Sequence, residues 1–317
     1  MQPRLELPAK DWRERGREPN IGRVTVQVAT KDRPRELYGF LASLLAQTYQ
    51  DWDLILVDDS VRPCWSNRVD AVRLLLEVIS KMNHNVRAFH VKRRGIDKSY
   101  DVALMATESE LGLREEDDHV LEGTYIEELV KAYDGALGLP YDIIGKGIAC
   151  VAGLSLNPND DLWDQPPLRD PARLRNFFYW DRGEHGKPCL IPNDDQRTPI
   201  VSDRVYWVAI LHGMWLYNVQ ALREIGGFAT VTNGWRGETA TTLKLWQEGY
   251  SLWVAPRAVA YHLPGPPAQG SHRGLHGKQE RAQLEEVFQE WLNERGERGC
   301  SIPIDLKWER LPQPSFS

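Results

Sequence analysis

Alternating apolar and polar positions near the start of the chain predict a buried strand. Residues 24–30 read VTVQVAT, with an apolar side chain at every second position. The chain then turns polar at Lys31-Asp32-Arg33-Pro34. Helical spacing of apolar residues follows within 35–47, at Leu37, Phe40, Leu41, Leu44 and Leu45. Residues 51–57 read DWDLILV and predict a second strand, which ends on Asp58-Asp59-Ser60.

Strand, helix and strand in this order form a βαβ unit. Such a unit has parallel strands and a right-handed crossover, and the ends of its strands face a common crevice. Residues 30–33 and 58–60 are therefore expected to lie side by side and to face a ligand.

Four consecutive carboxylates, Glu115 to Asp118, precede the run His119-Val120-Leu121. Hard divalent cations take oxygen ligands, and an ion held by one or two carboxylates keeps positions open for substrate phosphates. This pattern favours a metal site for a nucleoside diphosphate. The alternative is a solvated charged face, which is what most charge runs are.

The segment VTVQVATKDRPRELYGFLASLLAQTYQDWDLILVDDS resembles the nucleotide-binding start of the family 2 glycosyltransferases. The resemblance implies a GT-A (Rossmann-like) α/β fold, with a mixed, mostly parallel central sheet flanked by helices. Residues 113–121 resemble the segment that carries the family's metal-binding Asp-X-Asp motif, and Glu116 and Asp118 match its two acidic positions. Glutamate replaces the first aspartate, so Asp118 is the stronger candidate of the two.

The resemblance continues to about residue 265. Relatives have a helix ending at Gly-Gly-Phe, an acidic catalytic motif at a helix start, and a strand ending in Tyr-His; the chain has Gly226-Gly227-Phe228, Glu238 and Tyr261-His262 in this order. Glu238 matches the catalytic aspartate of the family, whereas Gly237 stands where a neighbouring glutamate is usual. A carboxylate that takes the proton of an attacking hydroxyl contributes about 10²–10⁴-fold to the rate, and Glu238 is the predicted base.

His262 closes the predicted strand and is a candidate third metal ligand beside Glu116 and Asp118. A packed or capping histidine is the alternative. Asp32 and either Asp58 or Asp59 match positions that bind the nucleobase in relatives, although aspartate is also favoured in turns for its own backbone hydrogen bonds. The remaining residues predicted to contact the nucleotide sugar are Thr30, Arg33, Arg94, Asp117 and Trp235. For Arg94, in the run 92–95, ordinary basic surface is the alternative to diphosphate binding.

The domain plan has an N-terminal extension (1–21), the GT-A domain (22–265) and a C-terminal part (266–317). An irregular insert at 155–204 is predicted to bind the acceptor, or else to be a surface elaboration without substrate contact. In relatives the loop after His262 closes over the nucleotide sugar, which suggests that His272, Arg273 and His276 meet phosphate. Five apolar residues between 284 and 292 predict a C-terminal helix for packing or for a homo-oligomer contact. The candidate acceptor-holding tryptophans are Trp163, Trp180, Trp207, Trp215 and Trp235.

The net charge of −6 over 317 residues offers no bulk attraction to nucleic acid or anionic lipid. The start of the chain has no apolar core of a signal peptide, and no run reaches the roughly 18 apolar residues of a membrane span. We therefore expect a cytoplasmic protein. Its four cysteines have no metal or redox spacing and are expected to be free thiols.

These observations predict a Mn²⁺- or Mg²⁺-dependent glycosyltransferase. The predicted donor is a nucleotide sugar, with UDP-sugar first, the acceptor is a hydroxyl, and the resemblance implies inversion. The alternative is a catalytically inactive nucleotide-binding or scaffold member of the same fold, suggested by Gly237 and Glu116. Nucleotidyl transfer fits less well, because residues 29–33 contain no glycine.

Overall fold

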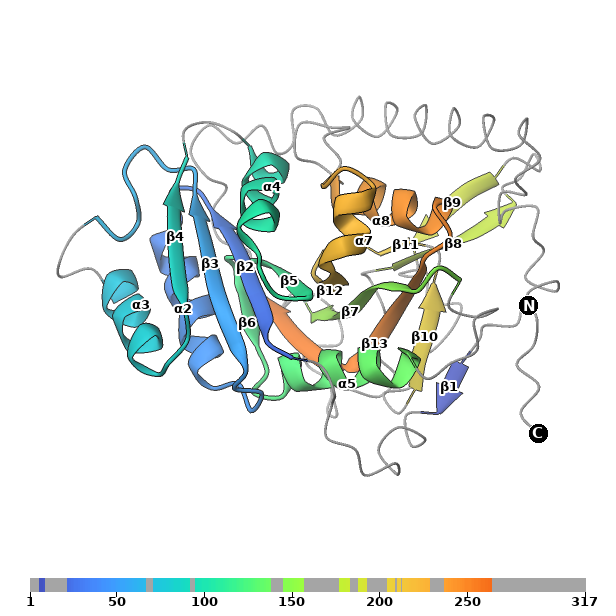
Figure 1. Ribbon diagram of the computed structural model, residues 1–317, viewed down its shortest axis with the longest axis horizontal. Coiled ribbons are helices and arrows are strands. Elements are labelled where there is room, and N and C mark those ends of the chain that lie inside the picture. Colours follow the sequence, from blue (N-terminus) through green and yellow to red (C-terminus); the bar gives the residue numbers. More distant parts are fainter. Residues whose placement is uncertain are drawn as a thin grey trace.

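A sheet of ten strands forms the centre of the part of the protein that the computed structural model describes (Figure 1). The described residues are 6–8, 22–66, 71–91, 95–137, 145–156, 177–182, 188–192, 204–208, 210–211, 213–228 and 237–263. The strand order is β1-β10-β13-β7-β12-β5-β2-β3-β4, and β6 pairs with β13. The strands of this sheet are β1 (Glu6–Pro8), β2 (Val24–Thr30), β3 (Trp52–Asp58), β4 (Val86–His90), β5 (Leu111–Glu116), β6 (His119–Leu121), β7 (Ile148–Leu156), β10 (Arg204–Val208), β12 (Trp215–Asn218) and β13 (Ser251–His262).

Most strands of the sheet run in one direction. Parallel pairing joins β5 to β2, β2 to β3, β3 to β4, and β7 to β13. Strand β12 lies between β5 and β7 and is antiparallel to both, so β5 and β7 share a direction. The sheet is therefore mixed and mostly parallel, as predicted.

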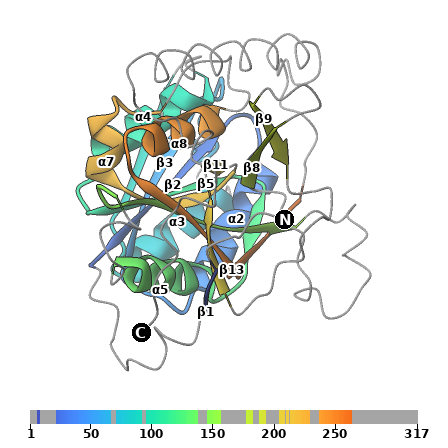
Figure 2. The same cartoon turned by 90° about the vertical axis from the view of Figure 1, so that its right-hand side faces the viewer.

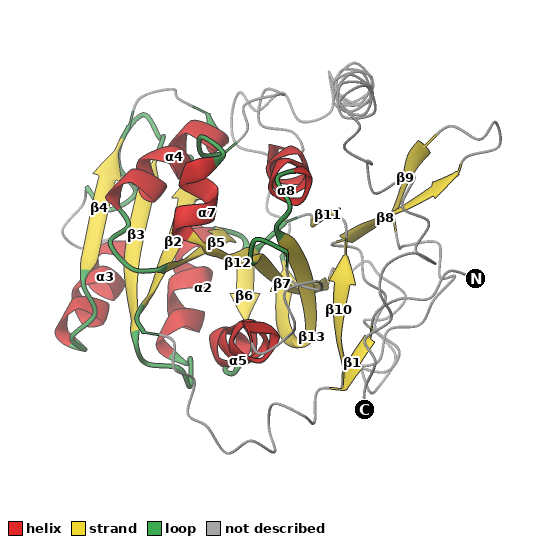
Figure 3. Ribbon diagram, turned by 45° about the vertical axis from the view of Figure 1, so that its right-hand side comes forward, coloured by secondary structure: helices red, strands yellow, loops and turns green. Residues whose placement is uncertain are grey.

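Helices cover both faces of the sheet (Figure 3). Helices α2, α3 and α5 pack into the hydrophobic cluster on one face, and α4, α7 and α8 pack on the other. The helices are α2 (Pro34–Leu45), α3 (Ala71–Lys81), α4 (Ile96–Ala106), α5 (Tyr125–Leu137), α7 (Val219–Glu224) and α8 (Gly237–Gln247). A sheet covered in this way needs apolar side chains on both faces of its central strands, which is the composition of β3.

The first βαβ unit follows its sequence pattern closely. Helix α2 begins at Pro34, whose fixed φ suits the first turn and whose missing N–H is not needed there. Its buried side chains Leu37, Phe40, Leu41 and Leu44 recur at helical spacing and face the sheet. Strands β2 and β3 are parallel and in register from Val24↔Trp52 to Thr30↔Asp58. The predicted strands and helix are confirmed to within two residues at their ends.

The region predicted to be an irregular insert contains two strands. Strands β8 (Phe177–Arg182) and β9 (Pro188–Pro192) pair antiparallel and, with β11 (Ile210–Leu211), form a separate three-stranded sheet. Figure 1 shows this small sheet at the end of the molecule away from α3, and Figure 2 views the molecule from that end. An acceptor-binding role for the insert stays a prediction.

Candidate functional site

Three parallel strand ends bring the predicted donor-site residues to one edge of the sheet. Thr30, at the end of β2, is in register with Asp58 of β3, and its neighbour Ala29 is in register with Glu116 of β5. The Asp59 N–H donates to the Thr30 carbonyl at 2.9 Å. The two segments predicted to lie side by side do so, because parallel strands end at the same edge.

Asp117 and Asp118 form the turn between β5 and β6, and Arg33 holds this turn. Arg33 donates through Nη1 to Asp117 Oδ1 at 2.8 Å and through Nη2 to Asp118 Oδ2 at 2.5 Å. Thr30 Oγ1 donates to Asp117 Oδ2 at 2.7 Å. The side chains of both aspartates are almost completely buried. Four residues predicted separately thus form one hydrogen-bonded cluster.

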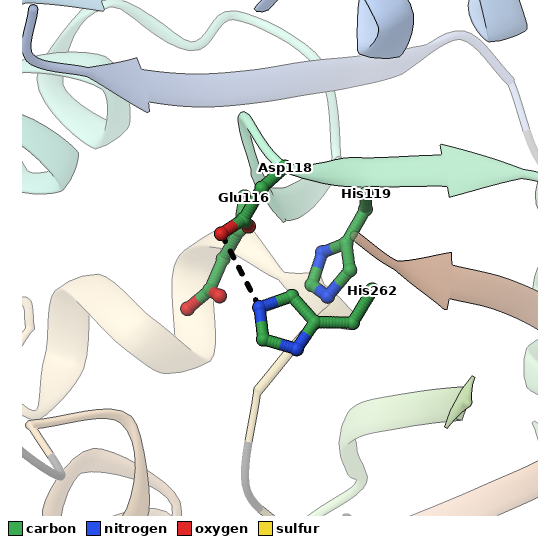
Figure 4. Close-up of side chains that lie close together, drawn as sticks. All are labelled: Glu116, Asp118, His119 and His262. Atoms are coloured by element: carbon green, nitrogen blue, oxygen red, sulfur yellow. Dashed lines mark hydrogen bonds and ion pairs between the residues drawn. The ribbon is translucent and has the colours of Figure 1, made fainter. Parts of the chain in front are cut away.

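Glu116, Asp118, His119 and His262 form a group of potential metal ligands (Figure 4). One ligand atom from each residue lies within 4.8 Å of the corresponding atoms of the others. His262 Nε2 lies 3.2 Å from Asp118 Oδ2. The fold therefore brings together the three side chains that the sequence predicts as metal ligands, although His262 lies at the far end of the domain from Asp118 in sequence.

His119 is a member of this group that the sequence motif does not predict. It begins β6, which pairs antiparallel with the end of β13 so that His119 lies directly opposite His262. The two ring centroids are 5.1 Å apart. The only signal in the sequence is its place directly after Asp118, and that position carries no information about a partner so far along the chain.

Protonation in the cluster is set by burial and by neighbouring charge. Burial opposes ionisation of Asp118, but the hydrogen bond from His262 and the nearby His119 and Arg33 hold its pKa below the usual range. Burial raises the pKa of Asp117 to about 7, against the opposing charge of Arg33. Burial also lowers the pKa of His119 to about 4, so its ring is neutral at pH 7. Metal binding needs an ionised carboxylate and a neutral imidazole, and the cluster offers both.

Asp118 carries a buried oxygen that lacks a partner in the described part of the chain. Asp118 Oδ1 is buried and makes no hydrogen bond, although its other oxygen contacts both Arg33 and His262. Buried polar atoms in native proteins are nearly always paired. A divalent ion would supply the missing partner, and the surrounding carboxylate and imidazole donors suit such an ion. The residues present therefore fit a divalent metal.

Arg114 connects the metal-ligand group to Glu238. Its guanidinium is fully buried, lies 4.4 Å from the centre of the Tyr100 ring, and donates to the Gly213 carbonyl at 2.6 Å. Arg114 Nη2 is 3.8 Å from Glu116 Oε1 and 3.9 Å from Glu238 Oε2. Both carboxylates thus lie within 4 Å of one nitrogen. A charged residue at the centre of β5 is the only signal of this bridge in the sequence, and its partners come from distant elements.

Glu238 stands in the first turn of α8, as the resemblance implies for the catalytic carboxylate. Its side chain is buried. A carboxylate in the first turn also interacts favourably with the positive end of the helix dipole. The bridge through Arg114 brings Glu238 to the same edge of the sheet as Glu116. The predicted base and a predicted metal ligand are therefore neighbours.

The other predicted aspartates make backbone contacts. Asp58 accepts from the N–H of Ser60 at 2.8 Å and of Cys64 at 2.6 Å, which is the turn role left open by the sequence. Asp59 Oδ2 accepts from the Gly95 N–H at 3.2 Å. Asp32 has a φ of 53°, a left-handed conformation that aspartate tolerates better than most residues. Nucleobase binding by these residues stays a prediction.

Several predictions lie outside the described residues: Arg94, Trp235, Trp163, the loop with His272, Arg273 and His276, and the C-terminal helix. Trp215 is fully buried and belongs to the core rather than to an open acceptor surface.

Cys64 and Cys150 are buried free thiols, as expected. None of the helices that the structure describes is long and apolar enough to cross a membrane. Cytoplasmic location and oligomeric state stay predictions.

Comparison with known protein families finds a match over the first part of the described sheet. Residues 25–148, from β2 to the start of β7, match the model of glycosyl transferase family 2. The match covers less than half of the chain and agrees with the resemblance found in the sequence. A search of curated proteins found no match.

Solved structures confirm the GT-A fold. GalNAc-T7, crystallised with UDP, GalNAc and Mn²⁺, aligns with a TM-score of 0.55 at 15% identity, over 79% of this chain and 45% of its own. The mannosyltransferase PcManGT from Pyrobaculum calidifontis, in complex with GDP-Man and Mn²⁺, aligns with a TM-score of 0.53 at 16% identity, over 96% of this chain and 77% of its own. The chain thus spans less than half of the GalNAc-T7 chain. At these identities the likeness shows the fold alone.

Proposed function

We propose that this protein is a family 2 glycosyltransferase that moves a sugar from a nucleoside-diphosphate sugar to an acceptor hydroxyl, with a divalent metal ion at Glu116, Asp118 and His262. The observation that carries the proposal is the ligand group at the strand ends, in which one buried oxygen of Asp118 has no partner among the described residues. Mn²⁺ accompanies a nucleotide or nucleotide sugar in both similar structures. Because one of these nucleotides is UDP and the other GDP, UDP-sugar is our first choice of donor and GDP-sugar the second.

Charge build-up on the departing diphosphate is the main electrostatic problem of this reaction. When bound, Mn²⁺ or Mg²⁺ supplies Lewis-acid stabilisation of the diphosphate oxygens. Arg33 contributes a second positive charge at the same edge, 2.5 Å from Asp118 and next to the predicted nucleotide-binding residues. Guanidinium groups bind phosphate oxygens through paired hydrogen bonds. Arg33 is therefore the side chain we propose to neutralise the leaving diphosphate together with the metal.

Glu238 is our proposed general base. Its carboxylate is buried, and Nη2 of the positively charged Arg114 lies 3.9 Å from its Oε2. In this role Glu238 accepts the proton of the acceptor hydroxyl while that oxygen attacks the anomeric carbon, and attack from the face opposite the diphosphate inverts the centre. The shared contact with Arg114 sets Glu238 close to the proposed metal site, as the base and the leaving group must both be near the transferred sugar.

Nucleotide binding is the first test. Calorimetry with UDP, GDP, CDP and dTDP, with and without Mn²⁺, should give metal-dependent preference for one nucleotide, followed by slow hydrolysis of the matching nucleotide sugar. Asp118→Asn should abolish the effect of Mn²⁺. Asp51→Asn is the matched control, because Asp51 is an exposed partner of Arg23 before β3. Binding without hydrolysis or transfer would identify the inactive nucleotide-binding member instead, and no binding to any nucleotide would overturn the proposal.

The base is tested separately. Glu238→Gln should lower transfer by about 10²–10⁴-fold while leaving nucleotide affinity unchanged within about twofold. Glu248→Gln is the control, because Glu248 lies just after the other end of α8 and pairs with Lys146 at 3.7 Å, away from the ligand group. Full activity of Glu238→Gln would remove Glu238 from the role of base.

A further inference from the structure

Strand β6 has an unusual position for so short an element. It contains three residues, His119–Leu121, and pairs antiparallel with the last three residues of β13. Residues directly opposite each other in an antiparallel pair place their side chains on the same face. The His119↔His262 pair is the outermost of this ladder, and Figure 4 shows both imidazole rings beside Glu116 and Asp118. The fold thus sets a second imidazole next to the three predicted metal ligands.

The hydrogen bonding of His119 leaves one ring nitrogen unused. Its Nε2 lies 3.3 Å from Ser155 Oγ on β7, within reach of a hydrogen bond. Its Nδ1 is buried and makes no hydrogen bond among the described residues; its nearest charged neighbour is Glu115 Oε2, at 3.7 Å. A neutral imidazole that donates Nε2–H to Ser155 presents the lone pair of Nδ1. His119 is only 3% exposed, so water does not readily satisfy this nitrogen.

We infer that His119 is a fourth ligand of the proposed metal ion, which makes the centre a two-carboxylate, two-imidazole site. The inference rests on the proposed function and extends it. Two observations on different residues carry it, namely the unused buried oxygen of Asp118 and the unused buried nitrogen of His119 among the described residues. Both residues belong to the group in which one ligand atom from each residue lies within 4.8 Å of the others. Two carboxylates also balance the charge of a divalent ion without any further group.

Ser155 has a positioning role in this arrangement. Histidines that bind metals usually donate the other ring N–H to a protein acceptor, which fixes the tautomer and the ring orientation. With His119 as a ligand through Nδ1, Ser155 Oγ, 3.3 Å from Nε2, accepts the Nε2–H hydrogen bond. The parallel β7–β13 register sets Ser155 opposite Ala260, two residues before His262. Strand β7 with Ser155 and strand β6 with His119 therefore both pair with β13, which carries His262.

The ligand set determines the class of metal. Mg²⁺ prefers six oxygen ligands and loses its water reluctantly, whereas imidazole nitrogen suits transition metals such as Fe²⁺, Ni²⁺ and Zn²⁺. A site with two nitrogens among four protein ligands therefore selects transition metals over Mg²⁺. A site with Glu116, Asp118 and a single histidine would discriminate less between transition metals and Mg²⁺, because most of its protein donors are hard oxygens.

Mn²⁺ bound to the full-length protein is the probe, and electron spin echo spectroscopy counts the ¹⁴N nuclei that couple to it. We expect two imidazole nitrogens in the wild-type spectrum. We expect Mn²⁺ to bind about tenfold or more tighter than Mg²⁺ by calorimetry. His119→Asn should leave one coupled nitrogen and weaken Mn²⁺ binding by about tenfold or more, with a smaller effect on Mg²⁺.

His84→Asn is the matched control for the loss of a buried imidazole. His84 is 4% exposed, stacks on Trp52 at the opposite end of β3, and should leave both the spectrum and the affinity unchanged. The wild-type spectrum tests the inference even where His119→Asn does not fold. A single coupled nitrogen in wild type would overturn the inference. A single coupled nitrogen would leave the proposed transferase function intact. Absence of Mn²⁺ binding even in the presence of UDP would overturn the metal site in the proposed function and in this inference.

Discussion

Arg33→Met removes the guanidinium charge that pairs with Asp117 and Asp118. These two residues form the acidic turn between β5 and β6. The guanidinium contacts Asp117 at 2.8 Å and Asp118 at 2.5 Å, and its side chain is 11% exposed against 5% and 1% for the two carboxylates. Unit charges about 4 Å apart interact by about 4 kcal/mol at an effective dielectric constant of about 20. Removing one partner of a buried pair costs about 3–5 kcal/mol, because the other charge stays buried and uncompensated.

We therefore expect Arg33→Met to lower the free energy of unfolding by about 3–5 kcal/mol in buffer with chelator. Mn²⁺ should restore part of this loss, because an ion bound to the folded state at 100 times its Kd stabilises by about 2.7 kcal/mol. Without nucleotide, the affinity of the variant for Mn²⁺ should also be higher than that of wild type by about tenfold or more, because the guanidinium no longer repels the ion at Asp118. Urea unfolding and calorimetry measure the two effects.

Arg23→Met is the control for this experiment. Arg23 contacts Asp51 and Asp53 at 2.8 and 3.1 Å but is 47% exposed, so its loss should cost less than about 1 kcal/mol and leave Mn²⁺ affinity unchanged. An Arg33→Met variant that loses no more stability than Arg23→Met, or that binds Mn²⁺ no more tightly than wild type, would refute the view of Arg33 as the internal counter-ion.

Two further predictions concern the protonation of a buried carboxyl and the packing of a strand glycine. Burial raises the pKa of Asp97 to about 7, so the folded carboxyl keeps a proton that the unfolded chain has lost, and its contribution to stability falls as the pH rises from about 4 to about 7. The free energy of unfolding of Asp97→Asn, measured in urea, should therefore rise relative to that of wild type across this pH range, by up to about 4 kcal/mol. A difference between the two proteins that does not change with pH would contradict the raised pKa of Asp97. Gly112→Ala should destabilise by about 1–3 kcal/mol, because the added Cβ would overlap the Tyr217 ring. Gly22→Ala has open space at its Cβ and should leave the melting temperature unchanged. Equal effects of the two substitutions would contradict the explanation by overlap with the Tyr217 ring.

The first βαβ unit could be predicted from the sequence because its determinants are local. The alternation in Val24–Thr30 and the helical spacing of Leu37, Phe40, Leu41 and Leu44 each depend on neighbours within a few residues. Parallel pairing then follows from chain topology alone, so the meeting of Thr30 with Asp58 was also predictable. The acidic turn at Asp117 and Asp118 was recognisable because its carboxylates are consecutive.

The full candidate site was not predictable in the same way. His119 gains significance only through its register with His262, and Arg114 only through contacts with Glu238 and Tyr100. Both are charged or polar groups that lie nine-tenths or more buried in the sheet. Burial of such groups is tolerated only with suitable partners, and no periodicity in the sequence identifies a partner on a distant element.

The sequence by itself determined the βαβ start, the resemblance to the family and the acidic turn, since short-range patterns of apolar residues and consecutive carboxylates are properties of the chain. The tertiary structure decided which side chains share the site. Strand β13 carries His262 to His119, and helix α8 carries Glu238 to Arg114. The physical reason is that ligand geometry and the pKa of buried groups depend on distances of a few ångströms between elements, and the sheet register sets those distances.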